Sequence, residues 1–192
     1  IALDGKRSDL HAKRAEALET LERYGDADQS WKRACALGAK QGDPLYYSRA
    51  QNLVYCLQDY GTAETVLRKG VALYPRSTRI HGLLIQVLGY YLGRFEDSLP
   101  LCEAGCALPT AGADIVGDYA YALGALGRAD DAKEQARLAL ERDEDGDALA
   151  VEFHFYLYAL TVGEDREARL RELRALLDQD TRTEDWDFGP II

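Results

Sequence analysis

Residues 119–133 read YAYALGALGRADDAK, and the fold follows from the pattern in this stretch. The first half of this stretch continues a series of apolar residues that begins just before it, at Val116. The series has the spacing of one helix face: Val116, Tyr119, Ala120 and Leu123. Gly127 comes next, where a glycine permits the positive φ that ends a helix and reverses the chain. A second amphipathic stretch begins at Ala129. The stretch therefore predicts two helices joined by a tight turn.

The same reversal recurs along the chain. Five glycines follow apolar segments of helical period: Gly25, Gly61, Gly93, Gly127 and Gly163. They are separated by 36, 32, 34 and 36 residues. A period near 34 is typical of a helix-turn-helix array, in which each pair of helices forms one repeat. No run alternates with period two between turn signals, so no sheet is expected.

Three stretches resemble the tetratricopeptide repeat: residues 119–133, residues 89–99 (GYYLGRFEDSL) and residues 138–143 (LALERD). The small residues of that family recur near their usual places, at Ala120, Ala132, Ala136 and Ala139. The resemblance covers roughly residues 8–180. Residues 31–38, with Trp31 and ACALG, are also compatible with the related Sel1-like repeat. Both families imply an all-α fold, a right-handed superhelix (solenoid) of about five antiparallel helix pairs.

The domain organisation follows from this repeat. We expect a helical repeat domain over residues 1–180, with repeats near 9–43, 44–76, 77–110, 111–146 and 147–180. The first helix of each repeat is expected near 9–23, 45–59, 79–92, 113–126 and 148–162. Helix starts are marked by Asp43-Pro44, Ser77 and Asp147, and Pro75 and Pro109 end the second helices of repeats two and three.

The segment 181–192 departs from the repeat. An acidic, polar linker precedes an apolar cluster that includes Trp186, Phe188, Ile191 and Ile192. A solenoid must cover the apolar face of its last repeat, so these residues are expected to pack there or to begin a capping helix. Two alternatives stay open: a docking peptide for a neighbouring molecule, and a cloning remnant.

Composition and charge restrict the class of partner. The net charge is −10, and residues 110–192 alone carry twenty acidic and nine basic side chains. Nucleic-acid binding needs clustered positive charge, so we expect no nucleic-acid partner and allow a basic protein or peptide. No apolar run approaches the roughly 20 residues of a membrane span, which predicts a soluble, cytoplasmic protein. The chain begins at Ile1 and contains no methionine, so a removed signal peptide or a larger parent protein stays open.

No constellation for catalysis or metal binding is recognisable. The three histidines, His11, His81 and His154, are far apart and lie in no nucleophile motif. Cys102 and Cys106 are four residues apart, but no second ligand pair stands at zinc spacing. Phosphate-binding glycine motifs are also missing. We therefore expect a protein that is not an enzyme and carries no cofactor.

Partner contacts are expected on the first helices, which line the inner, concave surface of such solenoids. The candidates are polar and tyrosine side chains outside the apolar pattern: Gln51, Asn52, Tyr55, Asp59, Gln86, Tyr90, Asp114, Asp118, Tyr121, His154 and Tyr158. Tyrosine supplies rigid contact area, and polar groups fix the register of a bound peptide. The aspartates are expected to be exposed, because burying an unpaired carboxylate is costly. Each tyrosine can equally serve as packing between repeats.

The sequence thus predicts a protein-interaction scaffold that binds a peptide or partner segment in a concave groove. One alternative is a regulatory or sensor module of a larger protein. Another is an adaptor that forms homo-oligomers through its C-terminal tail.

Overall fold

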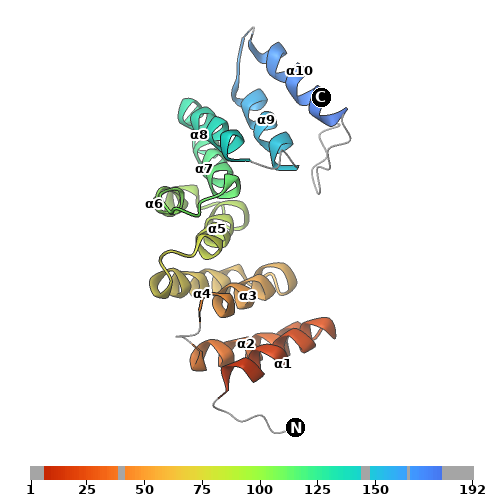
Figure 1. Ribbon diagram of the computed structural model, residues 1–192, viewed down its shortest axis with the longest axis vertical. Coiled ribbons are helices and arrows are strands. Elements are labelled where there is room, and N and C mark those ends of the chain that lie inside the picture. Colours follow the sequence, from red (N-terminus) through yellow and green to blue (C-terminus); the bar gives the residue numbers. More distant parts are fainter. Residues whose placement is uncertain (1–6, 39–41, 144–147, 164, 179–192) are drawn as a thin grey trace. The chain divides into compact units, whose positions relative to one another are not determined.

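The computed structural model describes residues 7–38, 42–143, 148–163 and 165–178. These residues form an all-α fold of ten α-helices and two π-helical turns (Figure 1). The α-helices are α1 (Ser8–Thr20), α2 (Tyr24–Leu37), α3 (Pro44–Gln51), α4 (Tyr60–Leu73), α5 (Thr78–Gln86), α6 (Phe95–Cys106), α7 (Ala113–Ala125), α8 (Ala129–Arg142), α9 (Ala148–Leu160) and α10 (Asp165–Leu177). The π-helical turns η1 (Asn52–Cys56) and η2 (Val87–Tyr91) directly extend α3 and α5. The predicted fold class is confirmed.

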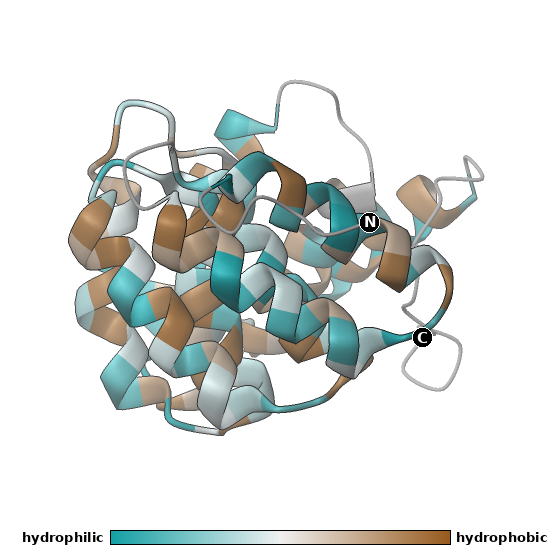
Figure 2. Cartoon of the chain, turned by 90° about the horizontal axis from the view of Figure 1, so that it is seen from below, coloured by the Kyte–Doolittle hydropathy of each residue, from teal (hydrophilic) through white to brown (hydrophobic). Residues whose placement is uncertain are grey.

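The chain divides into two compact units. The N-terminal unit spans Ile1–Arg94 and contains α1 to α5, and the C-terminal unit spans Phe95–Ile192 and contains α6 to α10. Hydrophobic and hydrophilic residues alternate along the individual helices (Figure 2), as expected for helices that bury one face. None of the helices in the described part is long and apolar enough to cross a membrane.

The first helix pair shows how small residues allow close packing. Ala15 and Leu18 of α1 form one buried cluster with Ala27, Trp31 and Ala34 of α2. The indole Nε1 of Trp31 donates a hydrogen bond of 2.7 Å to Oε1 of Glu19, which satisfies the one polar atom of that side chain. Because the alanines of α2 have small side chains, α1 and α2 can pack closely around the single large ring of Trp31.

In the C-terminal unit, α7 and α9 pack through a glycine. A Cβ atom added to Gly117 would collide with the ring of Phe153, which is almost fully buried. In the same unit, Ala132, Ala136 and Ala139 of α8 are all fully buried. These alanines recur at helical spacing, so the small-residue pattern of the sequence identifies the packed face of α8.

Each helix reversal places one residue in the left-handed region. That residue is Gly93, Gly127 or Gly163 in the last three repeats, with φ of 64°, 75° and 79°. In the first two repeats it is Glu22 and Gln58, with φ of 57° and 52°. The prediction that Gly25 and Gly61 close their first helices is therefore wrong. Both lie in the first turn of the second helix, α2 or α4, three residues after the left-handed position.

The two π-helical turns are a feature that the predicted continuous helices 45–59 and 79–92 did not include. They increase the sequence separation between donor and acceptor in the hydrogen bond that closes the reversal. Asp59 N–H donates to Leu53 O at 2.9 Å, and Arg94 N–H donates to Leu88 O at 2.7 Å. The corresponding bond in the first repeat, from Arg23 N–H to Leu18 O, spans one residue fewer. The extra residue also shifts the helix face, so that Leu57 is exposed.

The predicted helix starts have different outcomes. Ser77 caps α5, because its Oγ accepts a hydrogen bond from Ile80 N–H at 3.4 Å. Asp43 makes no cap bond, since its carboxylate accepts a hydrogen bond from Ser77 Oγ at 2.5 Å and pairs with Arg79 at 3.3 Å. Asp147 lies outside the described residues. The second helices α4 and α6 end before Pro75 and Pro109, as predicted.

Candidate partner-binding surface

Three predicted residues fall on one repeating position of the first helices. Gln51, Gln86 and Tyr121 lie 35 residues apart, and Tyr156 continues the series. One turn later, Tyr55 and Tyr90 occupy a second such position, at the end of their π-helical turns. The equal spacing means that these side chains project from equivalent places of successive repeats.

In the N-terminal unit these side chains form what we call the tyrosine-amide stripe: Ser48, Gln51 and Tyr55 with Gln86 and Tyr90. The two tyrosines are exposed, Tyr55 to 54% and Tyr90 to 39%, and the two glutamines are half-buried. Large exposed rings beside amides are typical of surfaces that bind peptides. The stripe carries no charged side chain.

In the C-terminal unit we call a second group the acidic-aromatic stripe: Asp114, Asp118 and Tyr121 of α7 with Glu152 and Tyr156 of α9. Of these residues, Tyr121 and Tyr156 are the equivalents of Gln51 and Gln86, and Tyr156 is only 6% exposed. Asp114, Asp118 and Tyr121 are spaced i, i+4 and i+7, so they lie on one face of α7. The phenol of Tyr156 donates a hydrogen bond of 2.5 Å to Oε1 of Glu152. Burial raises the pKa of the Glu152 carboxyl, and the bond from Tyr156 opposes that shift.

Asp118 is not exposed as expected. Only 8% of it is accessible, and its carboxylate makes interactions within the fold. Its negative charge adds to the effect of burial in raising the pKa of the neighbouring thiols Cys102 and Cys106, the latter to about 11. The expectation failed because α6 packs over this part of α7, which the spacing of apolar residues did not reveal. Asp114, at the first turn of α7, is exposed.

Four other predicted residues lie off the stripes. Asn52 is buried, and its Nδ2 donates to Tyr24 O at 3.2 Å. Asp59 is exposed and caps α4, where its Oδ1 accepts a hydrogen bond from Thr62 N–H at 3.0 Å. That bond holds the pKa of the Asp59 carboxyl below its usual range.

His154 and Tyr158 face α10. Nδ1 of His154 lies 3.7 Å from Oε2 of Glu172. Tyr158 packs with Leu173, and the guanidinium of Arg166 lies 4.6 Å from its ring centroid. The sequence of α9 is apolar on nearly every side, so its periodicity did not identify the face that carries Glu152 and Tyr156. The remaining candidates, Trp186, Phe188, Ile191 and Ile192, lie outside the described residues.

Solved structures of several proteins are similar to this chain. MamA from Desulfovibrio magneticus RS-1 (residues 41 to the end) is 19% identical, with a TM-score of 0.74 over 95% of this chain and 98% of that one. YrrB, a TPR protein with an unusual peptide-binding site, is 16% identical, with a TM-score of 0.68 over 92% and 89%. TTC0263, a thermophilic TPR protein of Thermus thermophilus, is 17% identical, with a TM-score of 0.65 over 93% of each chain.

This chain has the tetratricopeptide-repeat fold. The resemblance predicted from residues 119–133 is thereby confirmed at the level of the fold. No protein-family model matches the sequence, and no curated protein matches it. Tetratricopeptide repeats form extended surfaces along their first helices, which is where the two stripes lie.

The described part of this chain contains four thiols and three imidazoles, the side chains that most often carry nucleophilic or metal chemistry. Burial raises the pKa of Cys35 to about 11, and the pKa of the exposed Cys56 is raised as well, so these thiols are protonated at neutral pH. His11 and His81 are buried. Within the described residues, no group of three His, Cys, Asp or Glu side chains could hold a metal ion.

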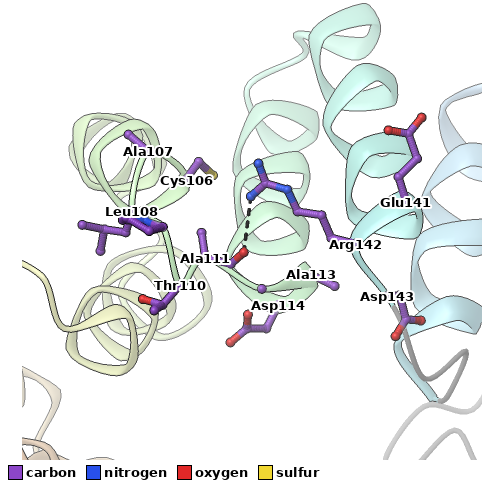
Figure 3. Close-up of a pocket in the computed structure, with 12 residues that line it drawn as sticks. Cys106, Ala107, Leu108, Thr110, Ala111, Ala113, Asp114, Glu141, Arg142 and Asp143 are labelled. Carbon is purple, nitrogen blue, oxygen red and sulfur yellow. Dashed lines mark hydrogen bonds between the residues drawn. The ribbon is translucent and has the colours of Figure 1, made fainter.

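The C-terminal unit also has a hollow of about 840 Å³ where the turn between α6 and α7 meets the end of α8. Arg142 extends into it and donates a hydrogen bond of 3.4 Å to Ala111 O (Figure 3). The carboxylates of Asp114, Glu141 and Asp143 also line it. The hydrogen bond from Arg142 links the end of α8 to the turn between α6 and α7. We therefore interpret this hollow as part of the packing between repeats.

Proposed function

We propose that this chain is a protein-interaction scaffold, without catalytic activity, that holds an extended or helical segment of a partner along its first helices. The observation that carries the proposal is the 35-residue recurrence of Gln51, Gln86, Tyr121 and Tyr156. Within each unit, side chains that recur at equivalent places of successive repeats suit a ligand with a repeating backbone, such as a peptide. That YrrB, a similar fold, has a peptide-binding site supports the same class of function.

The two stripes favour different parts of a ligand. The tyrosine-amide stripe offers exposed rings and amides, which suit apolar side chains and the peptide backbone. The acidic-aromatic stripe offers the exposed carboxylate of Asp114 on the same face of α7 as the half-buried ring of Tyr121, which suits lysine or arginine. We therefore propose a peptide with at least one basic residue as the ligand of the C-terminal unit.

Photo-crosslinking tests the location of the surface. p-Benzoylphenylalanine is placed at Tyr55 or Tyr90 of the tyrosine-amide stripe. The control position is Leu73, which is exposed on the second helix α4. Crosslinks to one defined partner from the stripe positions, without the same crosslink from Leu73, are expected. Equal crosslinking from all three positions would refute the proposed surface.

A displayed random-peptide library tests the chemistry. Selected peptides are expected to be enriched in lysine and arginine, and Asp114→Lys is expected to weaken their binding at least tenfold. Asp130→Lys is the charge-matched control, since the Asp130 side chain is 99% exposed on α8. If both variants weaken binding equally, overall charge and not the stripe is responsible. Asp118→Arg is unsuitable, because Asp118 is buried.

A further inference from the structure

A second hollow of the C-terminal unit lies between the second helices α8 and α10. Its volume is about 260 Å³. The described residues that line it are Lys133 and Arg137 of α8, Thr161 and Val162 of the reversal between α9 and α10, and Asp165, Ala168, Arg169 and Glu172 of α10. These residues belong mainly to second helices, so the hollow is separate from the stripes on the first helices.

Positive charge gathers in this hollow although its surroundings are acidic. Residues 110–192 contain nine basic side chains, and three of them line the hollow: Lys133, Arg137 and Arg169. Lys133 and Arg137 stand four residues apart on α8, an arrangement of like charges that slightly disfavours a helix. Helix stability therefore does not explain their spacing.

The carboxylates of the described residues leave these cations incompletely paired. Arg169 pairs with Glu172 at 2.7 Å, and Lys133 contacts Asp130 at 3.4 Å. Asp130 is 99% exposed, while the Lys133 side chain is only 20% exposed, so water screens the carboxylate more than the ammonium. Arg137 makes no ion pair with any residue that the structure describes.

The geometry points to a binding site for a single carboxylate group. Among the described residues, three cations and two carboxylates line the hollow, and Asp130, which contacts Lys133 from outside it, is 99% exposed. Arg137 is therefore the cation that a bound carboxylate would neutralise. The guanidinium of Arg137 can donate two parallel hydrogen bonds to such a group. The hollow is smaller than the roughly 300–1,000 Å³ of pockets for whole small-molecule ligands, so a group of side-chain size fits it. The carboxylate belongs to an acidic side chain of a partner or to a small free acid.

Nuclear magnetic resonance of the full chain, labelled with ¹⁵N, tests this site. Glutarate and a blocked hexaglutamate peptide are the two probes, and sodium chloride at equal ionic strength is the reference. The side-chain Nε–Hε signals of Arg137 and Arg169 are expected to shift saturably with either probe. Tighter binding of the peptide by tenfold or more identifies a partner side chain as the source, and equal or weaker binding identifies a free acid.

Three variants make the result specific. Arg137→Gln is expected to weaken carboxylate binding at least threefold, and Asp165→Asn to strengthen it about twofold by removing a competing carboxylate. Arg171→Gln, an exposed arginine of α10 outside the hollow, is expected to change nothing. The site is refuted if the shifts equal those in sodium chloride, or if Arg171→Gln weakens binding as much as Arg137→Gln does.

Discussion

The rings of Tyr121 and Tyr156 lie 5.9 Å apart between centroids, at equivalent positions of two successive repeats. The Tyr121 ring also meets the Phe95 ring edge-on, with their centroids 5.7 Å apart. Tyr121 is thus the middle ring of three, and it is half-buried for that reason. The same side chain packs the repeats together and borders the proposed peptide surface.

This double role predicts different effects for two substitutions of Tyr121. Tyr121→Ala removes both ring contacts and is expected to lower the free energy of unfolding by about 2 kcal/mol. Tyr121→Phe keeps both rings and is expected to change it by less than about 1 kcal/mol. Urea denaturation followed by circular dichroism measures both values. A Tyr121→Ala variant as stable as the wild type would show that the three rings contribute nothing to packing.

The left-handed residues at the reversals give a second prediction. Gln58 adopts φ of 52° with a side chain, whereas Gly127 adopts φ of 75° without one. Gln58→Gly removes this strain and is expected to stabilise the chain by up to about 1 kcal/mol, while Gly127→Ala is expected to destabilise it by a similar amount. Gly61→Ala is the control, because Gly61 is helical and an added Cβ would meet its nearest neighbour, Asp59 Oδ1, at an ordinary contact distance of 4.0 Å. A Gln58→Gly variant that is destabilised as much as Gly127→Ala contradicts this account.

The contact of Gly117 with Phe153 gives a third prediction. Gly117→Ala forces a methyl group into the Phe153 ring and is expected to lower the free energy of unfolding by about 1–3 kcal/mol. Phe153→Leu in the same chain is expected to restore part of that loss, because a smaller side chain makes room. A double-mutant cycle measures the coupling, and strictly additive effects would mean that the two residues do not touch.

A buried ion pair gives a fourth prediction. Arg49 Nε lies 2.8 Å from Asp28 Oδ1, and the two side chains are only 13% and 14% exposed. Asp28→Ala leaves a buried guanidinium without its partner and is expected to cost about 3 kcal/mol or more. The exposed pair of Arg23 and Asp26 is the comparison, and Asp26→Ala is expected to cost about 1 kcal/mol at most. Thermal melts of the two variants are to be compared, and equal losses would contradict the role of burial.

The fold could be predicted from the sequence because its signals are local and repeated. Apolar period, prolines and turn glycines recur in each repeat, so one weak repeat does not change the result. The reversals were located to within a few residues even where Gly25 and Gly61 were given the wrong role. A left-handed Glu22 or Gln58 leaves no sign in the sequence, because the closing hydrogen bonds of the turn impose that conformation.

The candidate surface could be predicted only in part. The common position of Gln51, Gln86 and Tyr121 follows from the sequence alone, because the three residues recur at a spacing of 35. That they contact a partner remains a prediction. The π-helical turns and the packing of α6 over Asp118 depend on contacts between helices, which no local pattern encodes. Glu152 and Tyr156 were missed because α9 is apolar almost throughout.

Glu152 itself gives the last prediction. Burial raises the pKa of its carboxyl above the ordinary value of 4.5, so the folded state binds this proton more tightly than the unfolded state does. Its contribution to stability is present below pH 4.5 and is lost as the pH rises through the pKa of the folded state. Glu152→Gln cannot ionise, and its amide oxygen can still accept the bond from Tyr156. The melting temperature of this variant, relative to the wild type, is therefore expected to rise between about pH 4 and pH 7.

Glu103→Gln is the control, because Glu103 is exposed and accepts a longer bond, 3.4 Å, from Tyr119. A relative melting temperature that falls over this range would mean that the folded state favours the ionised carboxylate.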